Sequence, residues 1–324
     1  AAIYHKIDSI SYLASDYFIP NEYDKLMSFI GSEGTNAYTS TDMTVYVEQI
    51  PSNQIENWAR IQADRFANPV IRGFHTELET VYEEKNMSLT KDFRKALEAM
   101  DGMLFPDHPY GTQTVLGTQE HLKNPSITNI KNYQKTYYVP NNMAICLSGD
   151  FNPDEMVAVI EKYFGQMEPN EDLPEITLTT SSVIESPVEK NVYGLDAENV
   201  MIGWKYPGAR SEDALVAEIV ASVLSNGSAG LIDLNINQQQ KVLGAYGMSY
   251  GRPDAGEFIL MGNPKQGQTL EEVRDILLAE VAKLRNGEFD EAVLSGTVNN
   301  MKKELMRSLE DNGSRADMFV QSFI

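Results

Sequence analysis

The sequence has 324 residues, 42% of them hydrophobic, so it is long enough for one large domain or two ordinary ones with substantial cores. Its formal net charge of −21 argues against nucleic-acid binding, which needs clustered Lys and Arg side chains. The single cysteine, Cys146, excludes an intrachain disulfide and a cysteine-rich metal site, and no run of eighteen apolar residues predicts a membrane span.

Helical stretches open the chain and are followed by a predicted β-hairpin. Residues 34–42 and 43–50 are rich in Thr, Tyr and Val with partial alternation, which is typical of two paired strands. Apolar residues at helical spacing then predict an amphipathic helix over 54–67. The hairpin and the helix together indicate a region with both α and β structure.

A second helix is expected after Phe74, with Thr76 and Glu79 at the spacing of a capping box. Further along, residues 143–150 predict a short buried strand that contains Cys146 as a core residue. A helix is predicted after it, from Asp154 to Phe164.

A Pro-, Thr- and Ser-rich stretch divides the chain into two predicted lobes. The first lobe covers residues 1–168, the linker 169–187, and the second lobe 188–324, with its C-terminal end expected to be truncated. The second lobe repeats the order of the first: a strand at Ala245, another over 257–261, a helix over 270–284 and a further helix. The expected fold is α+β, with two similar lobes, each a mainly antiparallel sheet with helices packed on one face.

The repeat also places the acidic residues of one helix in the first lobe alone. Aligning Phe74 with Phe289 puts Ala292 opposite Glu77. The same alignment puts Asn299 opposite Glu84. Any site on this helix is therefore expected in the first lobe.

Glu77 and Glu84 are seven residues apart and so lie on nearly the same face of a helix, with Cα atoms about 10 Å apart. One carboxylate could bind a metal while the other supports a neighbouring group by a hydrogen bond. The alternative is a solvated acidic stripe that suits the helix N-terminus. The spacing alone leaves both interpretations open.

No pair among the histidines His5, His75, His108 and His121 has the spacing of zinc ligands. His75 is a ligand or a capping residue, and His108 is predicted to pack within its loop. A serine nucleophile elbow, a phosphate loop and a dinucleotide fingerprint are missing, and residues 227–230 are too short a glycine motif to count.

Several motifs in order resemble the pitrilysin and insulinase family of inverted zinc peptidases, which includes the mitochondrial processing peptidase subunits. These motifs, spread over nearly the whole chain, are Gly34-Thr35-Asn36-Ala37-Tyr38-Thr39 with Asp42, Glu77 to Glu84, His108-Pro109-Tyr110, Tyr138 to Met143, Gly149-Asp150 and Lys162 to Gly165, with Ala245-Tyr246 and Gly256-Glu257-Phe258 in the second lobe.

The resemblance implies roles for specific residues. Glu84 matches the downstream glutamate that is the third zinc ligand, and Glu77 the acidic residue that supports the site. The resemblance further implies that Asn36, Ala37, Tyr38 and Thr39 form the strand to which an extended peptide substrate is added. The alternative for this strand is an ordinary sheet edge.

One family motif is absent. Members carry His-x-x-Glu-His upstream, with two zinc ligands and the general base, and family spacing would place it near His5, which does not replace it. These 324 residues thus contain no catalytic residue and are expected to bind no zinc alone, whereas the intact protein would. Truncation and natural loss of the motif are the two explanations.

The sequence therefore predicts a fragment of a zinc-dependent endopeptidase that cleaves extended peptides by metal-activated water and is inactive as it stands. The alternatives are a non-catalytic peptide-binding subunit of a peptidase complex and a structural surface protein. Expected partners are a peptide or unfolded protein and a second similar two-lobed half or subunit, with no nucleic acid. The chain is expected to be soluble, and a periplasmic location and membrane attachment through an upstream segment are both compatible with it.

Overall fold

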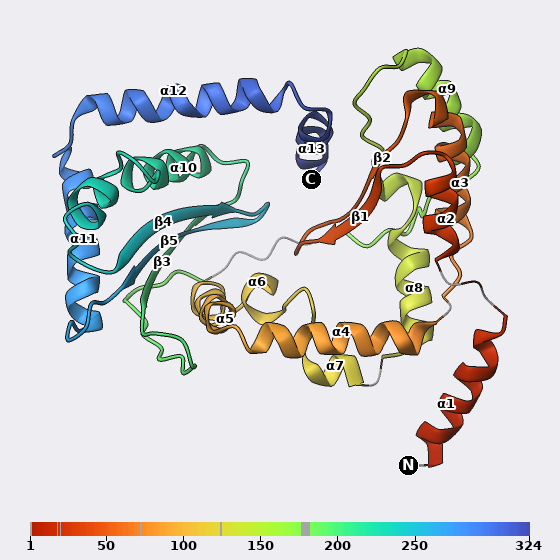
Figure 1. Ribbon diagram of the computed structural model, residues 1–324, viewed down its shortest axis with the longest axis horizontal. Coiled ribbons are helices and arrows are strands. Elements are labelled where there is room, and N and C mark those ends of the chain that lie inside the picture. The colour runs from red at the N-terminus through yellow and green to blue at the C-terminus, as the bar shows by residue number, and fades with distance from the viewer. Residues whose placement is uncertain (1, 18, 20, 72, 124, 176–181) are drawn as a thin grey trace. The chain divides into compact units, whose positions relative to one another are not determined.

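The computed structural model describes residues 2–17, 19, 21–71, 73–123, 125–175 and 182–324 (Figure 1). The chain forms two compact units. The first unit contains residues 1–88, 115–176 and 312–324, and the second contains 89–114 and 177–311. The predicted lobe boundaries stay a prediction, and residues 176–181 of the predicted linker lie outside the described residues.

The first unit is a set of helices around a two-stranded ribbon. Strands β1 and β2 pair antiparallel, with Gly34 opposite Gln49 and Thr39 opposite Thr44. The elements are α1 (Ala2–Ser15), α2 (Glu22–Phe29), β1 (Gly34–Thr39), β2 (Thr44–Gln49), η1 (Ser52–Gln54), α3 (Ile55–Ala67), α4 (Phe74–Leu89), α7 (Gln119–Lys123), α8 (Ile127–Tyr137), η2 (Pro140–Asn142), α9 (Pro153–Phe164) and α13 (Asn312–Phe323).

The core of the first unit lies where α2, α3 and α9 meet. Met27, Trp58 and Ala59 are buried there, and apolar side chains of α9 pack against them. The apolar residues of 54–67 line the buried face of α3, which confirms the predicted helix. The pairing of β1 with β2 confirms the predicted hairpin.

Three local predictions for the first unit are wrong. Residues 143–150 form no strand. The described sheets are β1 with β2, and β3 and β4 on either side of β5, so this segment has no partner strand among the described residues. Cys146 is half-buried rather than in the core, and its partial burial raises the pKa of its thiol. Thr76 is not a cap, because α4 already begins at Phe74 and its Glu77 N–H donates to the Gly73 carbonyl.

The second unit is built on a three-stranded antiparallel sheet in the order β3, β5, β4. Its elements are α5 (Asp92–Leu104), α6 (Pro109–Thr112), β3 (Val200–Pro207), α10 (Glu212–Leu224), a π-helix η3 (Asp233–Asn237), β4 (Gly244–Gly251), β5 (Ala255–Asn263), α11 (Leu270–Asn286) and α12 (Glu291–Ser308). The strands and helices predicted here from the repeat are confirmed.

Both faces of this sheet are covered. Phe258 and Leu260 of β5 point to one face, where they pack with the buried side chains of α10 and α11. On the opposite face, Met100 and Leu104 of α5 lie close to Gly203 of β3, where a Cβ would come within 2.6 Å of the Met100 sulfur. The α+β class is confirmed, and a helix from the first third of the sequence adds a layer that the repeat did not predict.

Candidate functional site

Glu77 and Glu84 both lie on α4 in the first unit, and both side chains are exposed. Among the residues that the structure describes, no group of three or more His, Cys, Asp and Glu side chains could hold a metal ion. A catalytic zinc takes three protein ligands and a water. The described residues therefore supply one candidate ligand in Glu84 and do not by themselves fit a zinc.

Two of the histidines make contacts within their own unit. His75 lies in the first turn of α4, where its ring meets the Phe74 ring edge-on with centroids 5.5 Å apart. His108, in the second unit, is buried, and its Nδ1 accepts a hydrogen bond from the Tyr110 N–H at 3.1 Å as the cap of α6. The predicted packing role of His108 in its loop is what the structure shows.

Strand β1 has one paired edge and one edge that no described strand occupies. The turn bond from Ser40 N–H to the Met43 carbonyl fixes the alternation of the ladder, because hydrogen-bonded pairs recur at every second residue. The backbone groups of Thr35, Ala37 and Thr39 consequently point to the free edge. These positions are the ones an added strand would use.

Residues 36–39 of this strand are all exposed, and side chains along it make hydrogen bonds. The Asn36 Oδ1 accepts a hydrogen bond from the outward N–H of Ala37 at 2.8 Å. The Tyr38 hydroxyl donates to Asp317 on α13 at 3.0 Å, and partial burial together with that bond raises the pKa of Tyr38. The edge is thus accessible, although the Ala37 N–H at its centre already donates to the Asn36 side chain.

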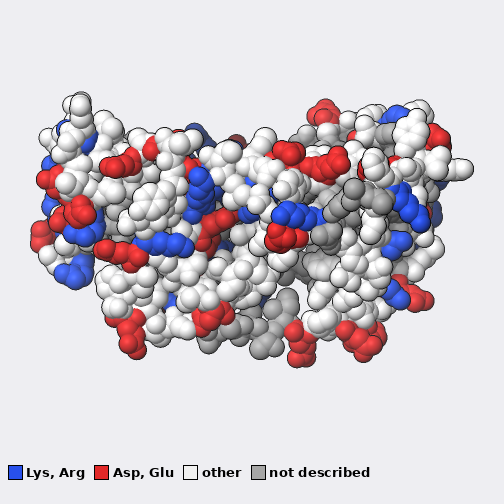
Figure 2. Space-filling model, turned by 90° about the horizontal axis from the view of Figure 1, so that it is seen from below, with Lys and Arg blue, Asp and Glu red and all other residues white. Residues whose placement is uncertain are grey.

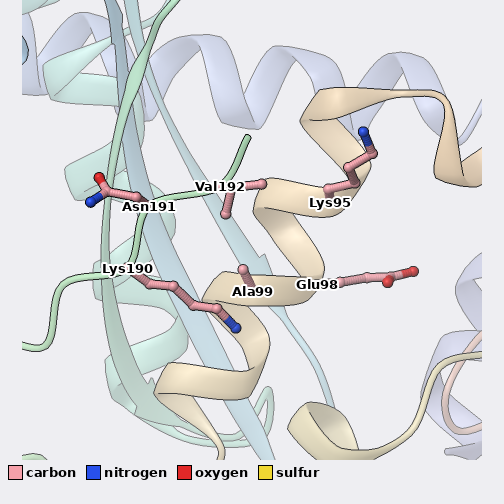
Figure 3. A pocket seen from close by; sticks show the side chains of 6 residues that line it. All are labelled: Lys95, Glu98, Ala99, Lys190, Asn191 and Val192. Carbon is pink, nitrogen blue, oxygen red and sulfur yellow. The ribbon is translucent and has the colours of Figure 1, made fainter. Parts of the chain in front are cut away.

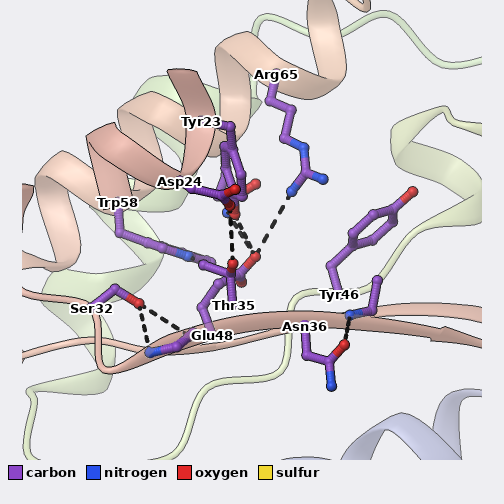
Figure 4. Close-up of polar contacts among 12 residues, drawn as sticks. Tyr23, Asp24, Ser32, Thr35, Asn36, Tyr46, Glu48, Trp58 and Arg65 are labelled. Carbon is purple, nitrogen blue, oxygen red and sulfur yellow. Dashed lines mark hydrogen bonds and ion pairs between the residues drawn. The ribbon is translucent and has the colours of Figure 1, made fainter. Parts of the chain in front are cut away.

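A polar cluster that the sequence did not predict joins this ribbon to the helices behind it (Figure 4). We call it the Glu48 cluster, and its members are Tyr23, Glu48, Trp58, Gln62 and Arg65. The Glu48 carboxylate accepts hydrogen bonds from the Tyr23 hydroxyl at 2.8 Å and the Gln62 amide at 2.9 Å. Burial and the bond to Glu48 raise the pKa of Tyr23 to about 12.

A second unpredicted cluster lies in the second unit. We call it the Arg252 cluster, and its members are Asp101, Phe105, Tyr110, Arg252 and Glu257. The buried Arg252 guanidinium lies 2.9 Å from Asp101 Oδ1 and 3.5 Å from Glu257 Oε1, with its carbon 4.8 Å from the Phe105 ring centre and 4.3 Å from that of Tyr110. The cluster connects α5 and α6 to the β4–β5 hairpin.

The two carboxyl groups of the Arg252 cluster share a pH dependence. Burial is the main cause that raises the pKa of Glu257, and the nearby Asp101 charge raises it further, while Arg252 opposes both. Burial likewise raises the pKa of Asp101. A group whose pKa is raised by folding stabilises the fold fully below its unfolded pKa and loses that contribution as pH rises.

We therefore expect the stability advantage of the natural protein over Glu257→Gln to shrink as pH rises from about 4 through neutrality. Each unit of difference between folded and unfolded pKa changes the unfolding free energy by about 1.4 kcal/mol. Urea unfolding of both proteins from pH 4 to 8 measures this. Glu304→Gln, an exposed change on α12, is the control, and parallel pH curves for all three proteins would contradict the prediction.

The glycine-containing loop before η3 uses its own amides internally. The buried Asp233 carboxylate accepts hydrogen bonds from the N–H groups of Asn226, Gly227 and Gly230 at 2.8, 2.9 and 3.1 Å. A phosphate loop would aim these donors at a ligand. The amides of Gly227 and Gly230 are therefore bonded within the loop and are not aimed at a phosphate.

A shallow pocket in the second unit is lined by Lys95, Glu98, Ala99, Lys190, Asn191 and Val192 (Figure 3). Lys95 bonds Asp92 at 2.8 Å, so its charge is already matched. The lining contains no histidine, serine, threonine or cysteine. It offers no chemistry that resembles the predicted activity.

Charged side chains of both signs are interspersed on the face drawn in Figure 2. Lysines and arginines gather into no basic patch on that face. No helix in the described ranges has the length and apolarity needed to cross a bilayer.

Comparison with known proteins identifies the family. Residues 126–301, more than half of the chain, match the family model described as the Peptidase M16 inactive domain. The chain belongs to the M16, pitrilysin-like, peptidase family. The resemblance drawn from the sequence motifs is confirmed.

The relatives in this family are proteases and processing-peptidase subunits. The chain is 21% identical to "Zinc protease PqqE" of Helicobacter pylori, over all of its own length and 74% of that protein. It is 29% identical to "Probable mitochondrial-processing peptidase subunit beta" of Schizosaccharomyces pombe, over 42% of its length and 30% of that protein.

Solved structures agree on the fold. A protease from Helicobacter pylori matches with a TM-score of 0.79 and 20% identity over 93% of this chain and 74% of that one. The periplasmic protease PqqL from Escherichia coli matches with a TM-score of 0.67 and 15% identity over 93% of this chain and 35% of that one. At these identities the likeness establishes the fold alone.

Proposed function

We propose that these residues are part of a zinc-dependent endopeptidase that binds extended peptides along β1 and cleaves them with a zinc held in part by Glu84. The observation that carries the proposal is the exposed, unpaired edge of β1 in a chain of the M16 family. Backbone groups on a free edge can bind a peptide by adding it as a strand.

Glu84 is the proposed metal ligand of this enzyme. It is exposed on α4, two helical turns from Glu77, which we propose supports the site through a hydrogen bond. The remaining ligands and the general base lie outside these 324 residues in this proposal. When bound, such a zinc polarises the scissile carbonyl and lowers the pKa of its water.

A non-catalytic, peptide-binding subunit is the second candidate. Two observations favour it: the family model that matches the chain describes an inactive domain, and the described residues alone do not fit a zinc. The edge of β1 would serve this function equally. A zinc measurement on the full-length protein separates the two candidates.

The proposed partners are an unfolded or extended polypeptide and a second, similar two-lobed half or subunit. A relative that is named as a processing-peptidase subunit supports the second of these. A periplasmic location is proposed from the likeness to periplasmic PqqL.

Replacing Ala37 with proline should weaken peptide binding at least about tenfold, because it removes the outward N–H at the centre of the free edge. That N–H makes no bond to β2 in the alternation set by the Ser40 turn, so proline is tolerated there as on other edge strands. The measurement is fluorescence anisotropy with labelled, unfolded casein.

Ala37→Val is the matched control, since it keeps the N–H and favours a strand. Equal casein affinity for the natural protein and both variants would show that β1 does not accept the peptide.

A further inference from the structure

The ribbon of β1 and β2 needs support from outside itself. A two-stranded hairpin is at best marginally stable in water, and the described residues pair no third strand with it. Its place in the first unit thus depends on contacts with the helices, which come from β1 through Thr35 and Tyr38 and from side chains of β2. Tyr46 and Glu48 are two residues apart and point to the same side of β2.

Tyr46 supplies the ring contacts on that side. Its ring meets Phe66 of α3 edge-on at 5.2 Å, and its hydroxyl lies 3.4 Å from that of Tyr138. The Arg65 guanidinium sits 4.8 Å from the Tyr46 ring centre and 4.0 Å from that of Tyr23. These contacts hold the ribbon mainly by ring packing, and Glu48 adds hydrogen bonds to α2 and α3.

The Glu48 carboxylate binds two helices at once. From α2, the Tyr23 hydroxyl donates to Oε1 at 2.8 Å. From α3, the Gln62 amide donates to Oε1 at 2.9 Å, and the Trp58 indole N–H lies 3.4 Å from Oε2. The side chain is only 7% exposed, and Arg65 lies 3.9 Å from Oε1 (Figure 4).

We propose that Glu48 is a positioning residue that holds the peptide-accepting strand β1 in place through β2. The peptide-binding part of this inference rests on the proposed function, whereas the effect of Glu48 on the ribbon can be tested without it. Glu48 lies opposite Thr35, the first residue whose backbone groups face the free edge. Releasing β2 from α2 and α3 would let the edge residues 35, 37 and 39 move out of register with a bound peptide.

The groups around residue 48 favour a hydrogen-bond acceptor there. Tyr23, Trp58, Gln62 and Arg65 all present N–H or O–H groups to residue 48, and an ionised carboxylate accepts without donating. Glutamine has the same shape, but its NH₂ group would face one of these donors. Glu48→Gln therefore keeps the side-chain volume and places a donor where the surrounding groups donate.

The experiment compares the natural protein with Glu48→Gln and with Glu33→Gln, which removes the same charge from an exposed side chain beside β1. Amide hydrogen exchange is followed by mass spectrometry, and casein binding by anisotropy. We expect Glu48→Gln to speed exchange in residues 34–49 and to weaken casein binding, each by about tenfold, the loss of about one charged hydrogen bond. Glu33→Gln should change neither.

A double variant, Glu48→Gln with Gln62→Glu, returns a carboxylate to the cluster and is expected to recover part of both losses. Unchanged exchange in residues 34–49 would overturn the proposal, as would faster exchange with unchanged casein affinity. Exchange that rises equally in α8 and α9 would show a general stabilising role and would overturn it too. Failure of the natural protein to bind casein contradicts the proposed function instead, while the exchange data still test the ribbon.

Discussion

Replacing Glu84 with glutamine is expected to abolish stoichiometric zinc binding in a full-length protein that carries a His-x-x-Glu-His motif. Two histidines from one helix and a carboxylate from another occupy three corners of a tetrahedron and leave the fourth for water. A neutral amide replaces the anionic ligand poorly. Metal analysis after extensive dialysis without chelator measures the loss.

Glu77→Gln is the matched control, because it makes the same change two turns away on α4, at a side chain that is also exposed. Groups that support a ligand through a hydrogen bond change metal affinity by roughly ten- to a hundredfold. Glu77→Gln should therefore still bind zinc, more weakly. Equal zinc content in the natural protein and both variants would contradict Glu84 as a ligand.

Absence of zinc from the full-length natural protein would bear on the choice between the two candidate functions. It would support the non-catalytic, peptide-binding subunit, since the described residues offer no complete ligand set of their own. In that case the casein measurement on Ala37→Pro remains the test of peptide binding.

Local sequence pattern was sufficient for most of the elements but not for what joins them. The Thr- and Tyr-rich residues 34–50 gave the hairpin because alternation is a local property. Residues 143–150 show the limit of that signal, since an apolar run becomes a strand only where a neighbouring strand is available. The layer formed by α5 on the second unit's sheet is likewise a long-range contact.

The candidate site divides in the same way. The roles of Glu84 and residues 36–39 come from the resemblance to family motifs. The structure places Glu84 on an exposed face of α4 and residues 36–39 on the free edge of β1, and their roles stay predictions. The bonds of Glu48 reach residues 25 and 14 positions away, and those of Arg252 reach 151 positions. No periodicity encodes pairs at such separations.

The Arg252 cluster provides the second large expected effect. The Arg252 side chain is 6% exposed, and its cation lies between two carboxylates whose pKa values burial raises. Removing one partner from a buried ionic group leaves uncompensated charge and typically costs about 3–5 kcal/mol. Arg252→Met, which keeps the length of an apolar stem, is expected to lose that much unfolding free energy at pH 7.

The loss should shrink at acid pH, because Asp101 and Glu257 then take up protons and no longer need a cation. Urea unfolding at pH 5 and pH 8 measures the difference. Arg274→Met is the control, since Arg274 pairs at the surface with Asp275 and its loss should leave stability nearly unchanged at both pH values. Adding Glu257→Gln to Arg252→Met removes one of the stranded charges and should recover part of the loss at pH 8. A penalty that is equal at both pH values, or unaffected by Glu257→Gln, would mean that Arg252 stabilises the second unit by packing on Phe105 and Tyr110 rather than by balancing buried charge.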